Sequence, residues 1–223
     1  MDYQEFLKTK VIEHRPSGFE VDINDLNPML FEWQKVVVRW ALYKGKCAMF
    51  ESCGLGKTPQ QLEWANQVYK HAGKNVLILA PLAVSGQTVR EGAKFGIEVH
   101  KCRTQKDVNP GINITNYEML DNFNPDEFVG IVLDESSLLK SFMGKTKRQI
   151  IDTFKSTPYK LCCTATPSPN DHMELLNHSD FLDVMPSNEA LARWFINDTM
   201  ALRVPGGPCP EVGRLGSVIR GPE

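Results

Sequence analysis

The sequence has no long apolar run, no recognisable leader and no strong net charge. None of its 223 residues falls in an apolar stretch long enough to cross a bilayer, and the N-terminus, M-D-Y-Q-E-F, is acidic and lacks the apolar core of a signal peptide. The formal net charge is −2, so no global field draws the chain to nucleic acid, and any such contact must come from a local patch. We therefore expect a cytoplasmic protein with no membrane partner.

Paired cysteines are also missing. The six cysteines form no C-x-x-C pair, and the neighbours Cys162 and Cys163 stand in an apolar run like small core residues. We expect them to be reduced and structural, with an oxidation-sensitive thiol at Cys53 as the alternative for that position. A hydrophobic content of 42% is enough for one good core, so a single main domain is expected.

What the sequence does contain is a Gly-rich stretch from Phe50 to Thr58, F-E-S-C-G-L-G-K-T. The apolar run 47–50 before it is short enough for a buried strand, and apolar residues after it recur at helical spacing. A strand, a Gly-rich turn and a helix form the context of a phosphate-binding loop. Glu51 stands where the first Gly of that motif belongs, so a Gly turn followed by a capped helix is the alternative.

In a phosphate-binding loop each of four residues has a physical task. Gly54 and Gly56 would let the backbone curl so that successive N–H groups point at phosphate oxygens. Lys57 would reach the β- and γ-phosphates, and Thr58 would place its hydroxyl on Mg²⁺.

Apolar runs alternate with helical spacing along the rest of the chain. Strands are expected at 47–50, 76–81, 98–101, 112–117, 129–135 and 160–163, and helices at 29–42, after the phosphate loop, and at 84–95. Repeated alternation of this kind predicts an α/β fold, with a mostly parallel sheet and helices on both faces. Candidate sites then lie at the carboxyl ends of the strands.

Two carboxylates, Asp134 and Glu135, close the apolar run 129–135. A carboxylate at the end of a strand beside a phosphate loop can hold Mg²⁺ through water, and its neighbour can activate the attacking water. The alternative is a strand that meets an acidic turn. The run 160–163 similarly ends in T-A-T-P, where Thr164 and Thr166 could bond the carboxylates and report the γ-phosphate, unless they merely form a Ser/Thr-rich turn.

These motifs, in this order, resemble the first RecA-like domain of superfamily 2 helicases, and among them Swi/Snf-type double-stranded DNA translocases of phage or prophage origin. The Gly-rich loop resembles D-E-M-G-L-G-K-T, and L-I-L-A-P-L-A-V at 77–84 is similar to the second conserved block. Residues 134–137, D-E-S-S, resemble the D-E-x-H box of these DEAD/DEAH-type proteins, and T-A-T-P with Asn170 and Glu174 resembles T-G-T-P-x-x-N-x-x-x-E-L. The resemblance spans about residues 27–195.

The resemblance implies a RecA-like P-loop NTPase that uses ATP and Mg²⁺, and it implies roles for particular residues. Nucleotide binding would fall to Gln34, Gly54, Leu55, Gly56, Lys57 and Thr58, with Gln34 on adenine. Thr58 and Asp134 would hold Mg²⁺, Glu135 and Lys57 would serve catalysis, and Ser137, Thr164 and Thr166 would couple hydrolysis to movement. Nucleic acid would lie on Pro81, Thr115, Asn116 and Lys140, and on the basic residues Lys145, Lys147 and Arg148, unless these are only a solvated face.

Two departures from the family pattern stand out. Ser137 replaces the His of the D-E-x-H box, and no second RecA-like domain, the source of the arginine finger, follows in these 223 residues. We divide the chain into an N-terminal extension (1–26), a RecA-like domain (27–199) and an irregular Pro/Gly-rich tail (200–223). The expected function is the first motor domain of a DNA helicase or translocase. A nucleotide-binding module without useful turnover, or a small-molecule kinase, are the alternatives.

Overall fold

The computed structural model describes residues 16–140, 144–168, 172–196 and 218–219. Its strands are β1 (Lys46–Phe50), β2 (Asn75–Ala80), β3 (Val99–Lys101), β4 (Ile112–Asn116), β5 (Phe128–Asp134), β6 (Tyr159–Thr164), β7 (Phe195–Ile196) and β8 (Val218–Ile219). Its α-helices are α2 (Glu32–Lys44), α3 (Lys57–Ala72), α4 (Leu82–Lys94), α5 (Gly144–Thr153), α6 (Leu175–Phe181) and α7 (Ser187–Trp194). Short 3₁₀ helices are η1 (Ile23–Asp25), η2 (Gln105–Asp107), η3 (Tyr117–Asn122), η4 (Pro125–Glu127), η5 (Ser136–Lys140) and η6 (His172–Glu174).

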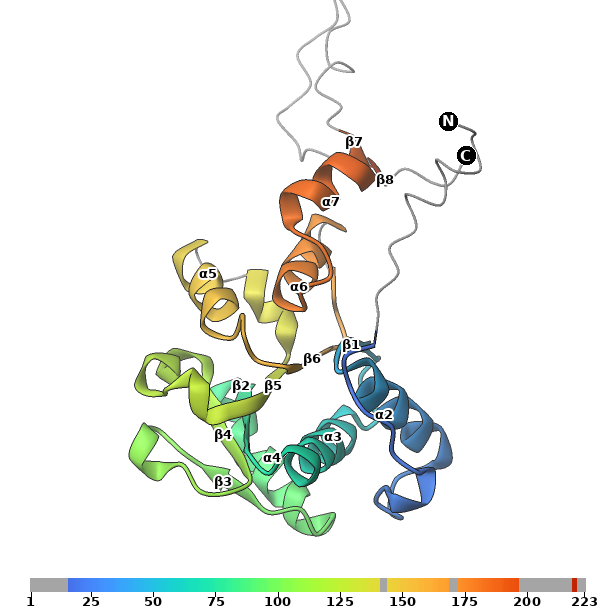
Figure 1. Cartoon of the computed structure of the whole chain (residues 1–223), viewed down its shortest axis with the longest axis vertical. Coiled ribbons are helices and arrows are strands. Elements are labelled where there is room, and N and C mark those ends of the chain that lie inside the picture. The colour runs from blue at the N-terminus through green and yellow to red at the C-terminus, as the bar shows by residue number, and fades with distance from the viewer. Residues whose placement is uncertain (1–15, 141–143, 169–171, 197–217, 220–223) are drawn as a thin grey trace, which may run out of the picture.

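Six of these strands form one parallel sheet in the order β1-β6-β5-β2-β4-β3. Parallel neighbours need crossover connections, and the helices between the strands supply them (Figure 1). The strands β7 and β8 pair with each other in antiparallel fashion, apart from this sheet. The predicted α/β fold with a parallel sheet is therefore confirmed.

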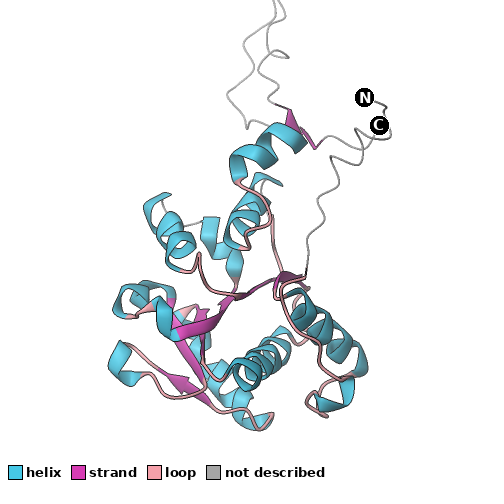
Figure 2. Ribbon diagram, in the orientation of Figure 1, coloured by secondary structure: helices cyan, strands magenta, loops and turns pink. Residues whose placement is uncertain are grey.

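The core has two layers because successive side chains of a strand point to opposite faces of the sheet. On β2, Val76 and Ile78 pack into the layer beneath α2 and α3, where Trp64 and Leu62 are fully buried. Leu77 and its neighbours on the other face pack into a second layer with residues of α5 and α6. Figure 2 shows the sheet between these helices, so both faces are covered as predicted.

The strand predictions agree with the structure to within two residues, but one helix begins later than predicted. The predicted helix 29–42 begins at Glu32, because Asn27 first makes a turn: its side-chain oxygen accepts from the Met29 N–H (3.0 Å) and its carbonyl from the Leu30 N–H (3.1 Å). Residues 1–15 of the predicted N-terminal extension and most of the predicted tail lie outside the described residues. No helix in the described ranges is long and apolar enough to cross a membrane.

Candidate functional site

The candidate site lies at the carboxyl ends of three adjacent strands. Phe50 at the end of β1 is paired with Thr164 at the end of β6, and Asp134 at the end of β5 is paired with Cys163. The sheet order therefore brings the Gly-rich loop (50–58), the Asp-Glu pair (134–135) and the T-A-T-P segment (164–167) to one edge, although they are far apart in sequence. This is the edge at which open parallel sheets bind ligands.

The Gly-rich loop has a backbone that glycine alone adopts at low cost. Gly54 (φ +84°) and Gly56 (φ +76°) are in the left-handed region, and a Cβ on Gly56 would come within 2.5 Å of the Gln34 amide nitrogen. The 16-residue helix α3 starts directly afterwards, at Lys57, so its first free N–H groups face the loop. The loop thus has the strand, turn and helix context that a phosphate-binding loop requires.

Lys57 is folded back across this loop. Its ammonium donates to the carbonyl oxygens of Glu51 (2.8 Å) and Ser52 (3.2 Å). These are exchangeable partners, because a phosphate group at the loop would offer the same ammonium charged oxygens in their place. Thr58, the next residue on α3, is half-buried.

Gln34 is tied to the same loop from α2. A glutamine on a helix is usually solvated, but this side chain is 4% exposed. Its Nε2 donates to the Leu55 carbonyl (3.0 Å) and its Oε1 accepts from the Phe31 N–H (3.0 Å), so the amide caps α2 while it holds the loop. The structure therefore brings Gln34 to the loop, and its contact with adenine stays a prediction.

Gln60 is a loop contact that sequence reasoning missed. This fully buried side chain sits in the first turn of α3, and its Nε2 donates to the Glu51 carboxylate (2.8 Å) and to the carbonyls of Leu55 and Gly56. Burial raises the pKa of Glu51, while Gln60 and the Lys57 charge lower it. The Glu that replaces the motif's first Gly thus braces the loop through Gln60. In the sequence, the only sign of this role was the position of Gln60 just after the loop.

Asp134 is a buried carboxylate that forms no ion pair with a cationic side chain among the described residues. It is 9% exposed, and the Tyr117 hydroxyl donates to its main-chain carbonyl (2.8 Å). Burial raises the pKa of Asp134 to about 6. The side-chain amide of Gln61 opposes this rise, as do the Glu135 backbone N–H and the Lys57 charge, while the charge of Glu135 adds to it. A cation beside Asp134 would offset the free-energy cost of burying its negative charge.

The donors at Asp134 fit Mg²⁺. Carboxylate and hydroxyl oxygens are ligands that Mg²⁺ accepts, and in phosphoryl-transfer sites one or two carboxylates plus substrate phosphates are sufficient. In the described part of the chain, no group of three or more His, Cys, Asp or Glu side chains could hold a metal ion by itself. Asp134 therefore suits a metal that is shared with a substrate, and the part of Thr58 in holding it stays a prediction.

Glu135 is held by hydroxyl groups on two segments. Its Oε1 accepts from Ser137 Oγ (2.8 Å) and from Thr164 Oγ1 (2.7 Å), and Thr164 Oγ1 in turn accepts from the Thr166 N–H (3.1 Å). Its backbone is left-handed (φ +55°), which costs a non-glycine residue about 1–2 kcal/mol and persists only where surrounding contacts impose it. The structure thus joins the predicted coupling residues to Glu135, with Thr166 contributing its backbone and exposing its side chain.

The predicted nucleic-acid contacts are only partly accessible. Pro81 is half-buried before α4, but the side chains of Thr115 and Asn116 are 2% and 8% exposed. In this conformation the Thr115 hydroxyl lies in the core and cannot reach a phosphate. Arg148 on α5 is exposed. The side chains of Lys140, Lys145 and Lys147, and all of Asn170, lie outside the described residues.

The all-parallel sheet, its strand order and the loop between β1 and α3 define a RecA-like α/β domain. Helicase and SWI2/SNF2 ATPase domains are among the solved structures with this fold. The Sulfolobus solfataricus SWI2/SNF2 ATPase core in complex with dsDNA superposes with a TM-score of 0.64 at 19% identity, over 79% of this chain and 41% of that one. The UvsW helicase from bacteriophage T4 superposes with a TM-score of 0.57 at 15% identity, over 82% of this chain and 64% of that one.

Curated proteins of similar sequence point the same way. DNA excision repair protein ERCC-6-like from Bos taurus is 28% identical over 187 residues, and its Mus musculus counterpart is 29% identical over 185 residues. Each alignment covers 70% of this chain and 15% of the relative, and no protein-family model matches the chain. These likenesses confirm the predicted resemblance to Swi/Snf-type helicase domains, with the fold that it implies.

Proposed function

We propose that this chain is the ATP-binding and ATP-hydrolysing first motor domain of a DNA helicase or translocase, and that it works with a second RecA-like domain. The observation that carries the proposal is the Glu135 carboxylate, fixed by Thr164 and Ser137 at the edge where the Lys57 loop opens. A carboxylate and a phosphate loop at the same edge of the sheet, with only β6 between their strands, are what phosphoryl transfer to water requires.

Binding of ATP would use groups that now bond to the loop itself. Lys57 would exchange the carbonyls of Glu51 and Ser52 for phosphate oxygens, and the N-terminus of α3 would add its free N–H groups. Gln34 lies beside the loop at Leu55, where its amide could bond adenine after a local shift.

Asp134 and Thr58 would hold Mg²⁺ at the same edge. When bound, the ion neutralises part of the charge that develops on the phosphates. The chain's own task there is to hold a buried carboxylate in place: Tyr117 fixes the Asp134 main chain, and the Gln61 amide lies beside the carboxylate itself.

Glu135 would orient the attacking water and accept its proton. Two hydroxyl donors fix the carboxylate at Oε1, so its direction does not depend on the substrate. Because Thr164 belongs to β6 and Ser137 follows β5, a shift of either segment would change the position of the Glu135 carboxylate. This connection is our structural basis for coupling hydrolysis to movement.

Duplex DNA is the proposed nucleic-acid partner. A structural neighbour was solved with dsDNA, and a basic segment of this chain includes Lys140, Lys145, Lys147 and Arg148. Such residues set affinity through phosphates and carry no sequence preference. The chain spans less than half of that neighbour and 15% of its curated relatives, so DNA movement is proposed for the motor in which this domain acts.

A nucleotide-binding module without useful turnover is the second candidate. The observation in its favour is that Glu135 Oε1 already accepts two hydrogen bonds, so both lone pairs of that oxygen are engaged by Ser137 and Thr164 in this conformation.

Nucleotide binding tests both candidates together. We expect Lys57→Ala to weaken binding of a non-hydrolysable ATP analogue roughly 10- to 100-fold, because charge-assisted bonds to phosphate are lost. Lys74→Ala, at an exposed lysine just beyond α3, is the matched control. Equal affinity in the Lys57 variant would refute the loop assignment.

For DNA, duplex binding should weaken steeply with added salt and after Arg148→Ala, and salt-insensitive binding would refute phosphate contacts.

A further inference from the structure

His178 on α6 is a buried histidine that none of the motifs includes. It is 4% exposed, and its Nε2 lies 3.0 Å from the Oγ of Ser136, which is fully buried. The edge of its ring also faces Phe50, with the ring centroids 5.2 Å apart and the planes at 80°. One side chain thus contacts both the residue after Glu135 and the residue before the Gly-rich loop.

These two contacts lie on strands that are not neighbours. Phe50 ends β1 and Ser136 follows β5, and β6 lies between those strands in the sheet. His178 therefore spans the width of β6 and connects the two segments that carry the loop and the Asp-Glu pair. The hydrogen bond between His178 and Ser136 thus joins the segment after β5 to α6.

The helix that carries His178 is itself well anchored. Phe181 is fully buried in the second core layer together with Leu182, and Lys160 Nζ donates to the Phe181 carbonyl (3.0 Å). Burial lowers the pKa of His178 to about 4, so the ring is neutral at pH 7 and its bond to Ser136 is one between neutral groups. A neutral ring on a fixed helix is suited to position a backbone.

The backbone that it fixes is the strained one. Glu135 is left-handed (φ +55°), and such a conformation persists only where neighbouring contacts impose it. Ser136, the next residue, is held from outside the strand by His178. We propose that His178 is a positioning residue, which through Ser136 keeps the Glu135 carboxylate at a fixed place relative to the Gly-rich loop.

This inference rests on the proposed function and assigns to α6 a part in the ATPase site. The competing explanation is core packing alone. The two differ in one respect: packing needs only the volume of the ring, whereas positioning needs its hydrogen bond to Ser136. Leucine supplies apolar volume without that bond, and glutamine supplies an amide that can restore it.

The test compares His178→Leu, His178→Gln and Ser136→Ala, with His172→Leu as the matched control at an exposed histidine. The measurements are kcat for ATP, Kd for ADP, and Kd for ADP with Mg²⁺ and aluminium fluoride, which imitates the transferred phosphoryl group. We expect kcat to fall about ten-fold in His178→Leu and Ser136→Ala, the usual worth of one buried hydrogen bond, with Kd for ADP changed less than about two-fold. His178→Gln should recover most of the loss, and the double variant should be no worse than either single one.

Unchanged kcat and unchanged binding of the aluminium fluoride complex in His178→Leu would overturn the inference while leaving the proposed function intact. If circular dichroism shows that His178→Leu does not fold, Ser136→Ala decides, because it removes one oxygen atom. If the unsubstituted chain binds nucleotide without turnover, binding of the aluminium fluoride complex replaces kcat as the readout. Failure of the unsubstituted chain to bind any nucleotide would overturn the proposed function, and this inference with it.

Discussion

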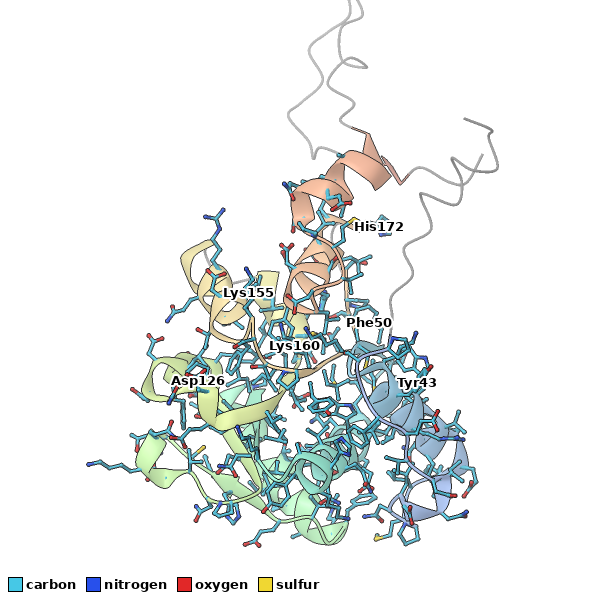
Figure 3. All side chains as sticks on the ribbon, in the orientation of Figure 1. Tyr43, Phe50, Asp126, Lys155, Lys160 and His172 are labelled. Carbon is cyan, nitrogen blue, oxygen red and sulfur yellow. The ribbon has the colours of Figure 1, made fainter. Side chains whose placement is uncertain are left out.

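The two ends of the parallel sheet hold buried charges in opposite circumstances. At the amino ends, Lys160 is fully buried and donates to Asp183 (2.7 Å), which also accepts from Lys46 (2.7 Å). At the carboxyl ends, within the part of the chain that the structure describes, Asp134 is buried without an ion pair, and one oxygen of Glu51 is buried without a hydrogen-bond partner. Figure 3 shows Lys160 within the body of the molecule, whereas Lys155 lies at its surface.

This difference assigns stability to the amino end of the sheet and ligand binding to its carboxyl end. A buried charge with its partner in place supports the fold, whereas one without a partner costs free energy until a ligand supplies the opposite charge. The amino end therefore stabilises the domain, and the carboxyl end is the part that a ligand bringing a cation would complete. Substitutions at the two ends should then have effects of opposite sign on stability.

The largest stability effect is expected at the amino end, from Asp183→Asn. Breaking a buried pair costs about 3–5 kcal/mol, and because the Asp183 side chain is 34% exposed we expect roughly 2 kcal/mol in the free energy of unfolding, measured with urea. Nucleotide affinity should stay unchanged. The companion variant is Lys160→Met, in which Asp183 would still form its ion pair with Lys46. This variant should therefore lower the free energy of unfolding less than Asp183→Asn does. A larger loss would contradict the conclusion that Asp183 is the shared partner of both lysines.

Asp134→Asn should instead stabilise the nucleotide-free chain, by about 2 kcal/mol at pH 7, because a desolvated charge is removed. The free energy of unfolding in urea would measure this. Loss of stability at neutral pH would contradict the contrast between the ends. Activity should be lost in the same variant, which is the usual trade between stability and function at a site.

The pH dependence of unfolding sharpens the same contrast. The pKa of Asp134 is raised to about 6 in the folded state, so its contribution is favourable below its unfolded pKa and is lost as pH rises through 6. The advantage of Asp134→Asn should therefore vanish below about pH 4. At Asp183 burial alone would raise the pKa, but the hydrogen bonds from Lys160 and Lys46 lower it below its usual value. The stability that Asp183 contributes is therefore lost only as the pH falls into the acid range. Parallel pH profiles for the two variants would refute the distinction.

The smallest effect is expected from Gln34→Ala. Loss of one amide contact should weaken ATP binding about five-fold and inorganic triphosphate binding less, if the amide reads adenine. Competition binding measures both ligands, and Gln87→Ala, at an exposed glutamine on α4, is the control. Equal losses for the two ligands would mean that Gln34 acts only on the loop, through Leu55.

Much of this architecture was predictable because it depends on local pattern. Apolar runs located the strands, and the left-handed glycines of the loop are required by a strand-to-helix turn at that point. The carboxyl-end location of Asp134 and Thr164 followed from the general behaviour of parallel sheets.

What could not be predicted depends on contacts between distant segments. The Gln60 brace, the Ser136–His178 pair and the burial of Thr115 arise from packing across the sheet, and no spacing in the sequence encodes them. The late start of α2 is a smaller example, since the Asn27 turn competes with helical hydrogen bonds. The domain boundaries and the roles of the site residues stay predictions.

Steady-state ATP hydrolysis by the purified chain, with and without duplex DNA, is the most direct test of the account. We predict measurable turnover that DNA increases, and a loss of at least about 100-fold in Glu135→Gln with ATP binding retained, because an amide cannot take the proton of water. Equal turnover by Glu135→Gln and the unsubstituted chain would contradict the claim that this end of the sheet is an ATPase site.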